Sequence, residues 1–149
     1  MKKIKFLLPL LLFITTIGFA QGHKEKREQI KALKVSFLTT ELKLTSEESA
    51  KFWPVYNAFE DKERNIKHNK MRGLIKKIEN AGGMDKLSEK EANSYLSQFQ
   101  EAEEELLELK KKLVADLKPI IGSVKTLKLQ KAEHDFNKKL LSKFADKRE

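Results

Sequence analysis

The sequence predicts an all-α protein of four helices, in which the second and third form a long antiparallel hairpin crossed by the first and fourth. Three observations support this fold class. Apolar residues recur at alternating spacings of three and four, two segments open with helix-capping sequences, and the whole chain has only six glycines and three prolines. The chain has no cysteine, so helix packing must supply its stability without disulfides.

The first 20 residues have the organisation of a secretory signal peptide. Three lysines near the start precede the apolar run 6–17, and Gly18 and Ala20 are the small residues expected before a cleavage site. This run is shorter than the roughly 20 apolar residues that span a membrane. We therefore expect export, cleavage after Ala20, a periplasmic location and a single helical domain over 21–149. An uncleaved N-terminal anchor is the alternative.

The charge of the chain bears on its partners. The net charge is +9, and loss of the signal peptide removes three lysines and no acidic residue. A basic protein can bind nucleic acid, but an exported chain rarely meets it, so we expect no nucleic-acid partner. The remaining excess fits either a solvated, lysine-rich surface or attraction to acidic partners, such as anionic lipid headgroups or acidic stretches of unfolded chains.

Two helices are expected before the glycine pair at 82–83. The first covers about residues 23–42 and is amphipathic, because apolar side chains recur on one face. The second opens at Thr45, which with Glu48 has the spacing of a capping box, and it ends at the glycine pair. Pro54 lies inside this helix and is expected to kink it.

Two further helices are expected after the glycine pair. The third opens at Ser88, three residues before a glutamate, and has the most regular apolar seam of the chain. The members of the seam are Ala92, Tyr95, Phe99, Ala102, Leu106, Leu109 and Leu113. A break is expected at Pro119, after which Ser123 can cap a fourth helix. The buried stripe of that helix should contain Val124, Leu127, Ala132, Phe136, Leu140 and Phe144.

The short connection at Gly83 predicts that the second and third helices are antiparallel neighbours. Folding the chain about this glycine would bring the basic stretch of one helix beside the acidic start of the other. We therefore expect Lys62, Arg64 and Lys67 to lie near the glutamates of 101–105. A thin helical layer of this kind leaves apolar surface uncovered, and a homodimer would cover it.

The start of the second helix resembles a known family. The residues that carry the resemblance are Leu44, Thr45, Glu48, Phe52, Trp53, Pro54, Tyr56 and Asn57. Together with the tail 127–141, they resemble the exported Bacteroidetes proteins called sensors of extracytoplasmic-function (ECF-type) sigma factors. More distantly, both helix openings resemble the L-T-x-x-Q motif of Spy/CpxP-type periplasmic proteins. Here Glu48 and Glu91 stand in place of glutamine, and Ser88 replaces the second threonine.

The resemblance implies a non-enzymatic periplasmic envelope-stress protein that binds a ligand, a protein partner or an unfolded client on a helical surface. Such a protein would influence a sigma-factor response through a membrane-bound signalling partner. A Spy/CpxP-like chaperone for unfolded clients is one alternative, and a periplasmic heavy-metal sensor or resistance protein is another. The residues that carry the resemblance are expected to be structural.

Basic residues of the second helix are the candidate site for clients or acidic partners. They are Lys62, Arg64, Lys67, Lys70 and Arg72. A solvated face, partly neutralised by the third helix, is the alternative. The nearby aromatic residues can also bind a client, although their helical spacing is more typical of a core.

The sequence has no pattern that predicts catalysis. It lacks a phosphate loop, a G-x-G-x-x-G turn and a nucleophile elbow. None of its three histidines has the helical partner four residues away that a zinc pair needs. We therefore expect no enzymatic activity, no cofactor and no metal site.

Overall fold

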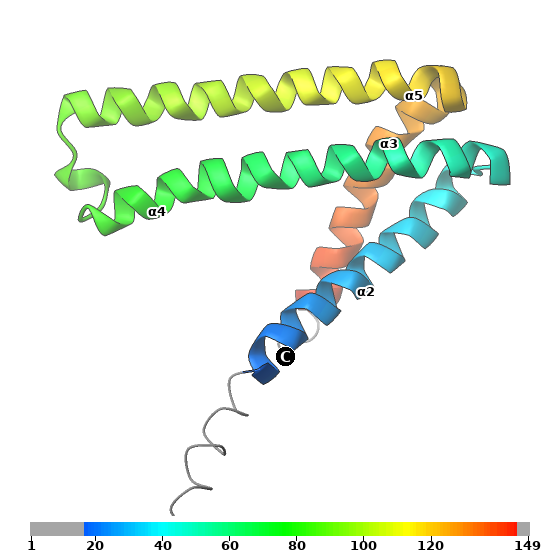
Figure 1. Ribbon diagram of the computed structural model, residues 1–149, viewed down its shortest axis with the longest axis horizontal. Coiled ribbons are helices and arrows are strands. Elements are labelled where there is room, and N and C mark those ends of the chain that lie inside the picture. The colour runs from blue at the N-terminus through cyan, green and yellow to red at the C-terminus, as the bar shows by residue number, and fades with distance from the viewer. Residues whose placement is uncertain (1–16, 146–149) are drawn as a thin grey trace, which may run out of the picture. The chain divides into compact units, whose positions relative to one another are not determined.

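The computed structural model describes the backbone of residues 17–145 and the side chains of 25–142 (Figure 1). Every regular element in this part of the chain is helical, so the all-α prediction is confirmed. Most of the predicted signal peptide, residues 1–16, lies outside the described residues, and its cleavage stays a prediction. Within the described residues, no helix has the length and apolar character that crossing a membrane requires.

Residues 17–145 form three long helices. The elements are α2 (Ile17–Leu42), α3 (Ser46–Arg64), the π-helix η1 (Asn65–Met71), α4 (Arg72–Asn80), the 3-10 helix η2 (Met84–Lys86) and α5 (Glu89–Ala145). The segments α3, η1 and α4 follow one another without a gap and make one helix, with α2 and α5 as the other two. The structure therefore has three long helices rather than the predicted four, because α5 covers both the expected third and the expected fourth helix, with a break inside it at Gly122.

The break expected at Pro119 lies three residues later, at Gly122. The helix α5 continues through Pro119, whereas Gly122 has the non-helical angles φ 76° and ψ 162°. Glycine adopts positive φ easily because it has no Cβ. Proline removes one helical N–H bond and crowds the preceding turn, but α5 accommodates it here without leaving the helical conformation. The Thr126 hydroxyl donates to the Gly122 carbonyl over 2.8 Å and so satisfies one acceptor at the break.

The buried stripe after Gly122 differs in part from the predicted one. Ala132 and Phe136 are buried as expected, but Val124 and Leu127 are each 70% exposed. Leu129 is buried instead, and a helical period through it and Ala132 places the two exposed residues on the opposite side. The side chain of Phe144 lies outside the described residues.

The chain divides into two compact units, Lys43–Lys131 and a terminal unit that joins α2 to the part of α5 from Ala132 onward. In the terminal unit, the rings of Phe37 and Phe136 are 5.6 Å apart. The crossing of the hairpin by the first and fourth helices stays a prediction.

In the unit 43–131, the continuous helix α3–η1–α4 runs antiparallel to the first part of α5 (Figure 1). The buried apolar residues of this unit are Phe52, Tyr56, Phe59, Ile66, Leu74, Ile78, Ala102, Leu113, Leu117, Ile121 and Leu129. Of the predicted seam, Ala102 and Leu113 are buried and the other members are half-buried. Partial burial is expected of a layer two helices wide, because each helix has a neighbour on only one side.

Both predicted capping boxes are present. The Glu48 backbone N–H donates to the Thr45 hydroxyl over 3.2 Å, and the Thr45 backbone N–H donates to the Glu48 carboxylate over 2.8 Å. Ser88 and Glu91 make the same pair of bonds, over 3.3 and 2.9 Å. These bonds satisfy N–H groups that have no partner within the helix, and so they fix where α3 and α5 begin.

Replacing Thr45 with alanine should lower the free energy of unfolding by about 1 kcal/mol, because the Glu48 N–H loses its acceptor. Urea denaturation followed by circular dichroism would measure the change. Thr45→Ser keeps the hydroxyl and is the matched control, for which a smaller change is expected. An alanine variant as stable as the parent chain would contradict a stabilising role of the cap.

The connection between α4 and α5 shifts the register of the hairpin. Lys70 forms an ion pair with Glu105, whereas folding about Gly83 would have placed residue 61 opposite that glutamate. This displacement exceeds two helical turns. The connection contains η2 and is no tight turn at Gly83, so the first turns of α5 extend beyond the end of α4. The predicted antiparallel pairing is therefore present in a different register.

Candidate binding surface

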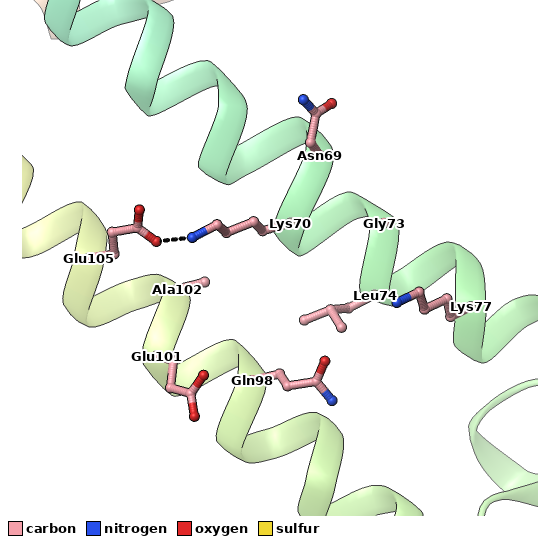
Figure 2. Close-up of a pocket in the computed structure, with 9 residues that line it drawn as sticks. All are labelled: Asn69, Lys70, Gly73, Leu74, Lys77, Gln98, Glu101, Ala102 and Glu105. Atoms are coloured by element: carbon pink, nitrogen blue, oxygen red, sulfur yellow. Dashed lines mark hydrogen bonds and ion pairs between the residues drawn. The ribbon is translucent and has the colours of Figure 1, made fainter.

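A hollow lies between α4 and α5 where two small residues leave space. Gly73 and Ala102 line it together with Leu74, and its volume is about 420 Å³. A Cβ built on Gly73 would meet no atom within 4 Å, so the absence of a side chain there leaves open room. Figure 2 shows the Leu74 side chain directed from α4 toward α5, which gives the hollow an apolar wall.

Polar side chains surround this apolar wall. They are Asn69, Lys70, Lys77, Gln98, Glu101 and Glu105 (Figure 2). The ion pair between Lys70 and Glu105 bridges the two helices at one end, and each of these side chains is 48% exposed. Both charges therefore stay largely hydrated, and such a pair sets register more than it stabilises. An apolar wall with a rim of both charges can hold a side chain of a bound polypeptide.

The π-helix η1 supplies two residues of this rim, Asn69 and Lys70. At its end the N–H of Arg72 donates to the Lys67 carbonyl, five residues back, where an α-helix would use the carbonyl four residues back. Such a step rotates the residues that follow relative to an ideal α-helix. π-helices are rare and frequently occur at functional sites, which draws attention to this segment.

Two of the predicted basic residues are paired within their own helix. Arg64 forms an ion pair with Asp61, and Lys67 Nζ lies 2.7 Å from a Glu63 carboxylate oxygen. The prediction that these residues lie against the glutamates of α5 is therefore wrong, because the register shift brings Lys70 to that place instead.

Other basic residues of the same helix are exposed and have no ion-pair partner among the described residues. They are Lys62, Arg72, Lys76 and Lys77. Cations that are not neutralised by the protein's own acids are the ones available to an acidic partner. Of these four, Lys77 also borders the hollow.

The junction before α3 is held by a lysine that the sequence did not single out. Lys125 Nζ donates to both carboxylate oxygens of Glu48, over 2.9 and 2.6 Å, and to the Lys43 carbonyl over 2.9 Å. Lys43 is the one non-glycine residue with positive φ, 48°, among the described residues. The lysine therefore fastens the strained turn between α2 and α3 to the segment after Gly122.

These bonds lower the pKa of Glu48. The largest cause is the hydrogen bond from Lys125, followed by the bond from the Thr45 backbone N–H. A carboxyl group whose pKa is lower in the folded than in the unfolded protein stabilises the fold when the pH is above its unfolded-state pKa. This stabilisation is lost as the pH falls through the folded-state pKa. The pKa values of Glu47 and Glu91 are lowered as well. The largest causes are the hydrogen bonds from Lys51 to Glu47 and from Ser88 to Glu91.

Stability should therefore be nearly constant between pH 7 and about pH 5.5 and fall below the ordinary glutamate pKa of 4.5. Urea denaturation midpoints at several pH values would measure the fall. In Glu48→Gln the midpoint should be lower at pH 7 and should decline less in acid. Glu79→Gln, at an exposed residue with no ion pair among the described residues, is the matched control and should keep the parent profile.

Most aromatic residues of the resemblance lie in the core. Phe52 and Tyr56 are fully buried, and their rings stack with centroids 5.2 Å apart and planes 13° apart. Trp53 is half-buried and meets both rings edge-on. Pro54 is exposed, and α3 continues through it. Asn57 is half-buried, and its Oδ1 atom is buried without a hydrogen-bond donor among the described residues.

A second hollow, of about 410 Å³, lies in the terminal unit between α2 and the end of α5. Apolar residues line it, among them Leu33, Phe37, Phe136 and Leu140. Lys139 Nζ lies 4.7 Å from the centroid of the Phe37 ring, a cation–π contact at its edge. His68 and His134 are exposed, and within the described residues no three His, Cys, Asp or Glu side chains gather as a metal site would need.

Sequence reasoning missed Lys125 and the hollow at Gly73. Glu48 and Lys125 are 77 residues apart in the chain, so no local pattern joins them. No family model, curated protein or solved structure matches the chain. A function for the chain must therefore be argued from the resemblance of residues 44–57 and from the geometry of the hairpin.

Proposed function

We propose that this chain is a non-enzymatic, exported envelope-stress protein that holds a protein partner on its helical hairpin. Its predicted signal peptide and the resemblance of residues 44–57 to sensors of ECF-type sigma factors support this assignment. The observation that carries it is the hollow at Gly73, together with the exposed cations of α3 and α4 that have no ion-pair partner among the described residues.

The exposure of the hollow favours binding over catalysis. Electrostatic catalysis needs charges held in a site from which water is excluded. Here the ion pair between Lys70 and Glu105 is half in solvent, so its charges are screened by water. A shallow apolar wall with a polar rim suits a polypeptide segment, whose side chains and backbone can use both.

The partner should carry acidic residues. Lys62, Arg72, Lys76 and Lys77 attract a negatively charged segment, and Lys77 borders the hollow, which can take a side chain of that segment. Because export separates the protein from a cytoplasmic sigma factor, the signal would pass through a membrane-bound partner. Misfolded envelope proteins would compete with the membrane-bound partner for the hairpin. Release of that partner would then signal envelope stress.

Lys76→Glu combined with Lys77→Glu should weaken binding of the partner by about fivefold or more, because two attractive charges become repulsive. Partner capture is measured by cross-linking in cells, and the sigma-factor regulon by transcript levels under envelope stress. Lys118→Glu combined with Lys128→Glu changes the net charge equally at exposed residues away from the hollow and is the control. Unchanged capture in the first variant, or an unchanged regulon after deletion of the gene, would reject this function.

A chaperone for unfolded clients is the second candidate, favoured by exposed apolar residues on the same unit. Ile75, Leu96 and Leu107 are 39%, 59% and 52% exposed. Apolar surface suits unfolded chains, and the cations of the same unit that lack an ion-pair partner among the described residues suit acidic ones. Light scattering of an acidic protein that aggregates when its disulfides are reduced would test this activity. Aggregation that continues undiminished at a several-fold excess of the chain would exclude it.

A further inference from the structure

The buried face of the continuous helix α3–η1–α4 falls into two parts that differ in register by one residue. Helices that pack along one another meet at alternating steps of three and four residues, which gives a repeat of seven. The buried residues of the first part follow this repeat, and they are Phe52, Tyr56, Phe59 and Ile66. Continued past Ile66, the repeat leads to positions 70, 73 and 77.

The second part of the buried face lies one residue later than this repeat. Lys70 still keeps to it, because it forms an ion pair with Glu105 of α5. Beyond Lys70 the buried residues are Leu74 and Ile78, each one position later than the repeat requires. The helix therefore contains one residue more between Lys70 and Leu74 than a regular buried face would have.

The backbone of η1 takes up this extra residue. A π-helix closes its hydrogen bonds over five residues instead of four, so its turn holds one residue more than an α-helical turn. The bond from the Arg72 N–H to the Lys67 carbonyl has this span. The helices α3 and α4 on either side are α-helical. The hydrogen bonds and the burial therefore locate the insertion in the same place by independent means.

The insertion decides which residues line the hollow. The positions that an uninterrupted repeat would turn toward α5 are those of Gly73 and Lys77, and both line the hollow. Gly73 leaves it open, because a Cβ there would meet no atom within 4 Å. Leu74, one residue further on, forms the apolar wall instead (Figure 2). Without the extra residue, the side chain of Leu74 would come to the place that Gly73 leaves open.

We propose that η1 is a one-residue insertion that positions the residues of the hollow and keeps it open for the partner, a role that rests on the proposed function. A glycine inside a helix lowers its stability, and π-helices are rare. Gly73 has a helical backbone and no close neighbour, so neither its conformation nor its packing requires a glycine. The open space is the property that the glycine and the π-helix share.

Deletion of Met71, the last residue of η1, tests the insertion without reference to a partner. It joins the two parts of the buried face into one repeat. The chain should therefore keep its helix content by circular dichroism, with a urea midpoint equal to or above that of the parent chain. Deletion of Ala58, an exposed residue of α3, is the matched control, because it turns Phe52 and Tyr56 away from the buried face and should lower the midpoint. Equal losses of stability in the two deletion variants would overturn the inference.

Binding of a peptide tests the role of the insertion. The probe is a fluorescent synthetic peptide in which one leucine stands between acidic residues, and its binding is followed by anisotropy. Met71→Ala should bind like the parent chain, because it keeps the number of residues in η1. Deletion of Met71 should weaken binding by about fivefold or more, because the leucine of the peptide loses its pocket. Gly73→Leu should weaken binding similarly, since it fills the hollow and leaves η1 unchanged.

The outcomes separate this inference from the proposed function. A chain without Met71 that binds as tightly as the parent, while Gly73→Leu binds weakly, would overturn the role of η1 and leave the hollow as the binding site. A parent chain that binds the peptide no better than one with serine in place of the leucine would reject the hollow itself, and with it any role of η1 in binding.

Discussion

Replacing Phe52 with alanine is expected to lower the free energy of unfolding by about 4 kcal/mol, the largest effect of any single substitution considered. Phe52 has no exposed surface, and its ring contacts two others. Removing it loses the transfer free energy of the ring and leaves a cavity beside Trp53 and Tyr56. These stiff rings fill such space poorly, since each also packs against the other.

Chemical denaturation followed by tryptophan fluorescence would measure this loss, because Trp53, the one tryptophan of the chain, lies beside the substituted ring. Phe99→Ala removes the same group from the half-buried seam and is the matched control. Phe99→Ala should lower the free energy of unfolding by less than half as much as Phe52→Ala, because part of the Phe99 ring is already in contact with water. Equal losses at the two positions would contradict the assignment of Phe52 to the core.

The features predicted correctly from sequence are those that depend on nearby residues. The capping boxes at Thr45 and Ser88 each act over three residues, so their pattern is complete in the sequence. The all-α class likewise follows from helical periodicity. The seam was located because the alternating spacing continues over many turns of α5.

The predictions that failed concern positions where the sequence allows more than one local backbone conformation. Pro119 and Gly122 can both interrupt a helix, and the sequence does not show which of them does so. The structure uses Gly122, where positive φ changes the backbone direction within one residue. The register of the hairpin was wrong for a related reason, since the conformation of the connection decides how far α5 extends past α4.

The candidate site could be predicted only in part. The basic residues were visible in the sequence, but their partners depend on the register, and Lys70 rather than Lys67 reaches Glu105. The hollow at Gly73 arises only when Ala102 of another helix comes opposite it. The π-helix η1 does not follow from helical periodicity alone.

Leu117→Ala is expected to lower the free energy of unfolding by about 3 kcal/mol, because this side chain of α5 has no exposed surface. Leu107→Ala makes the same chemical change on the same helix, at a residue that is 52% exposed, and should cost less than about 1 kcal/mol in the monomer. Urea denaturation at low chain concentration measures both. Equal losses in the two variants at low concentration would show that the buried face of α5 is assigned wrongly.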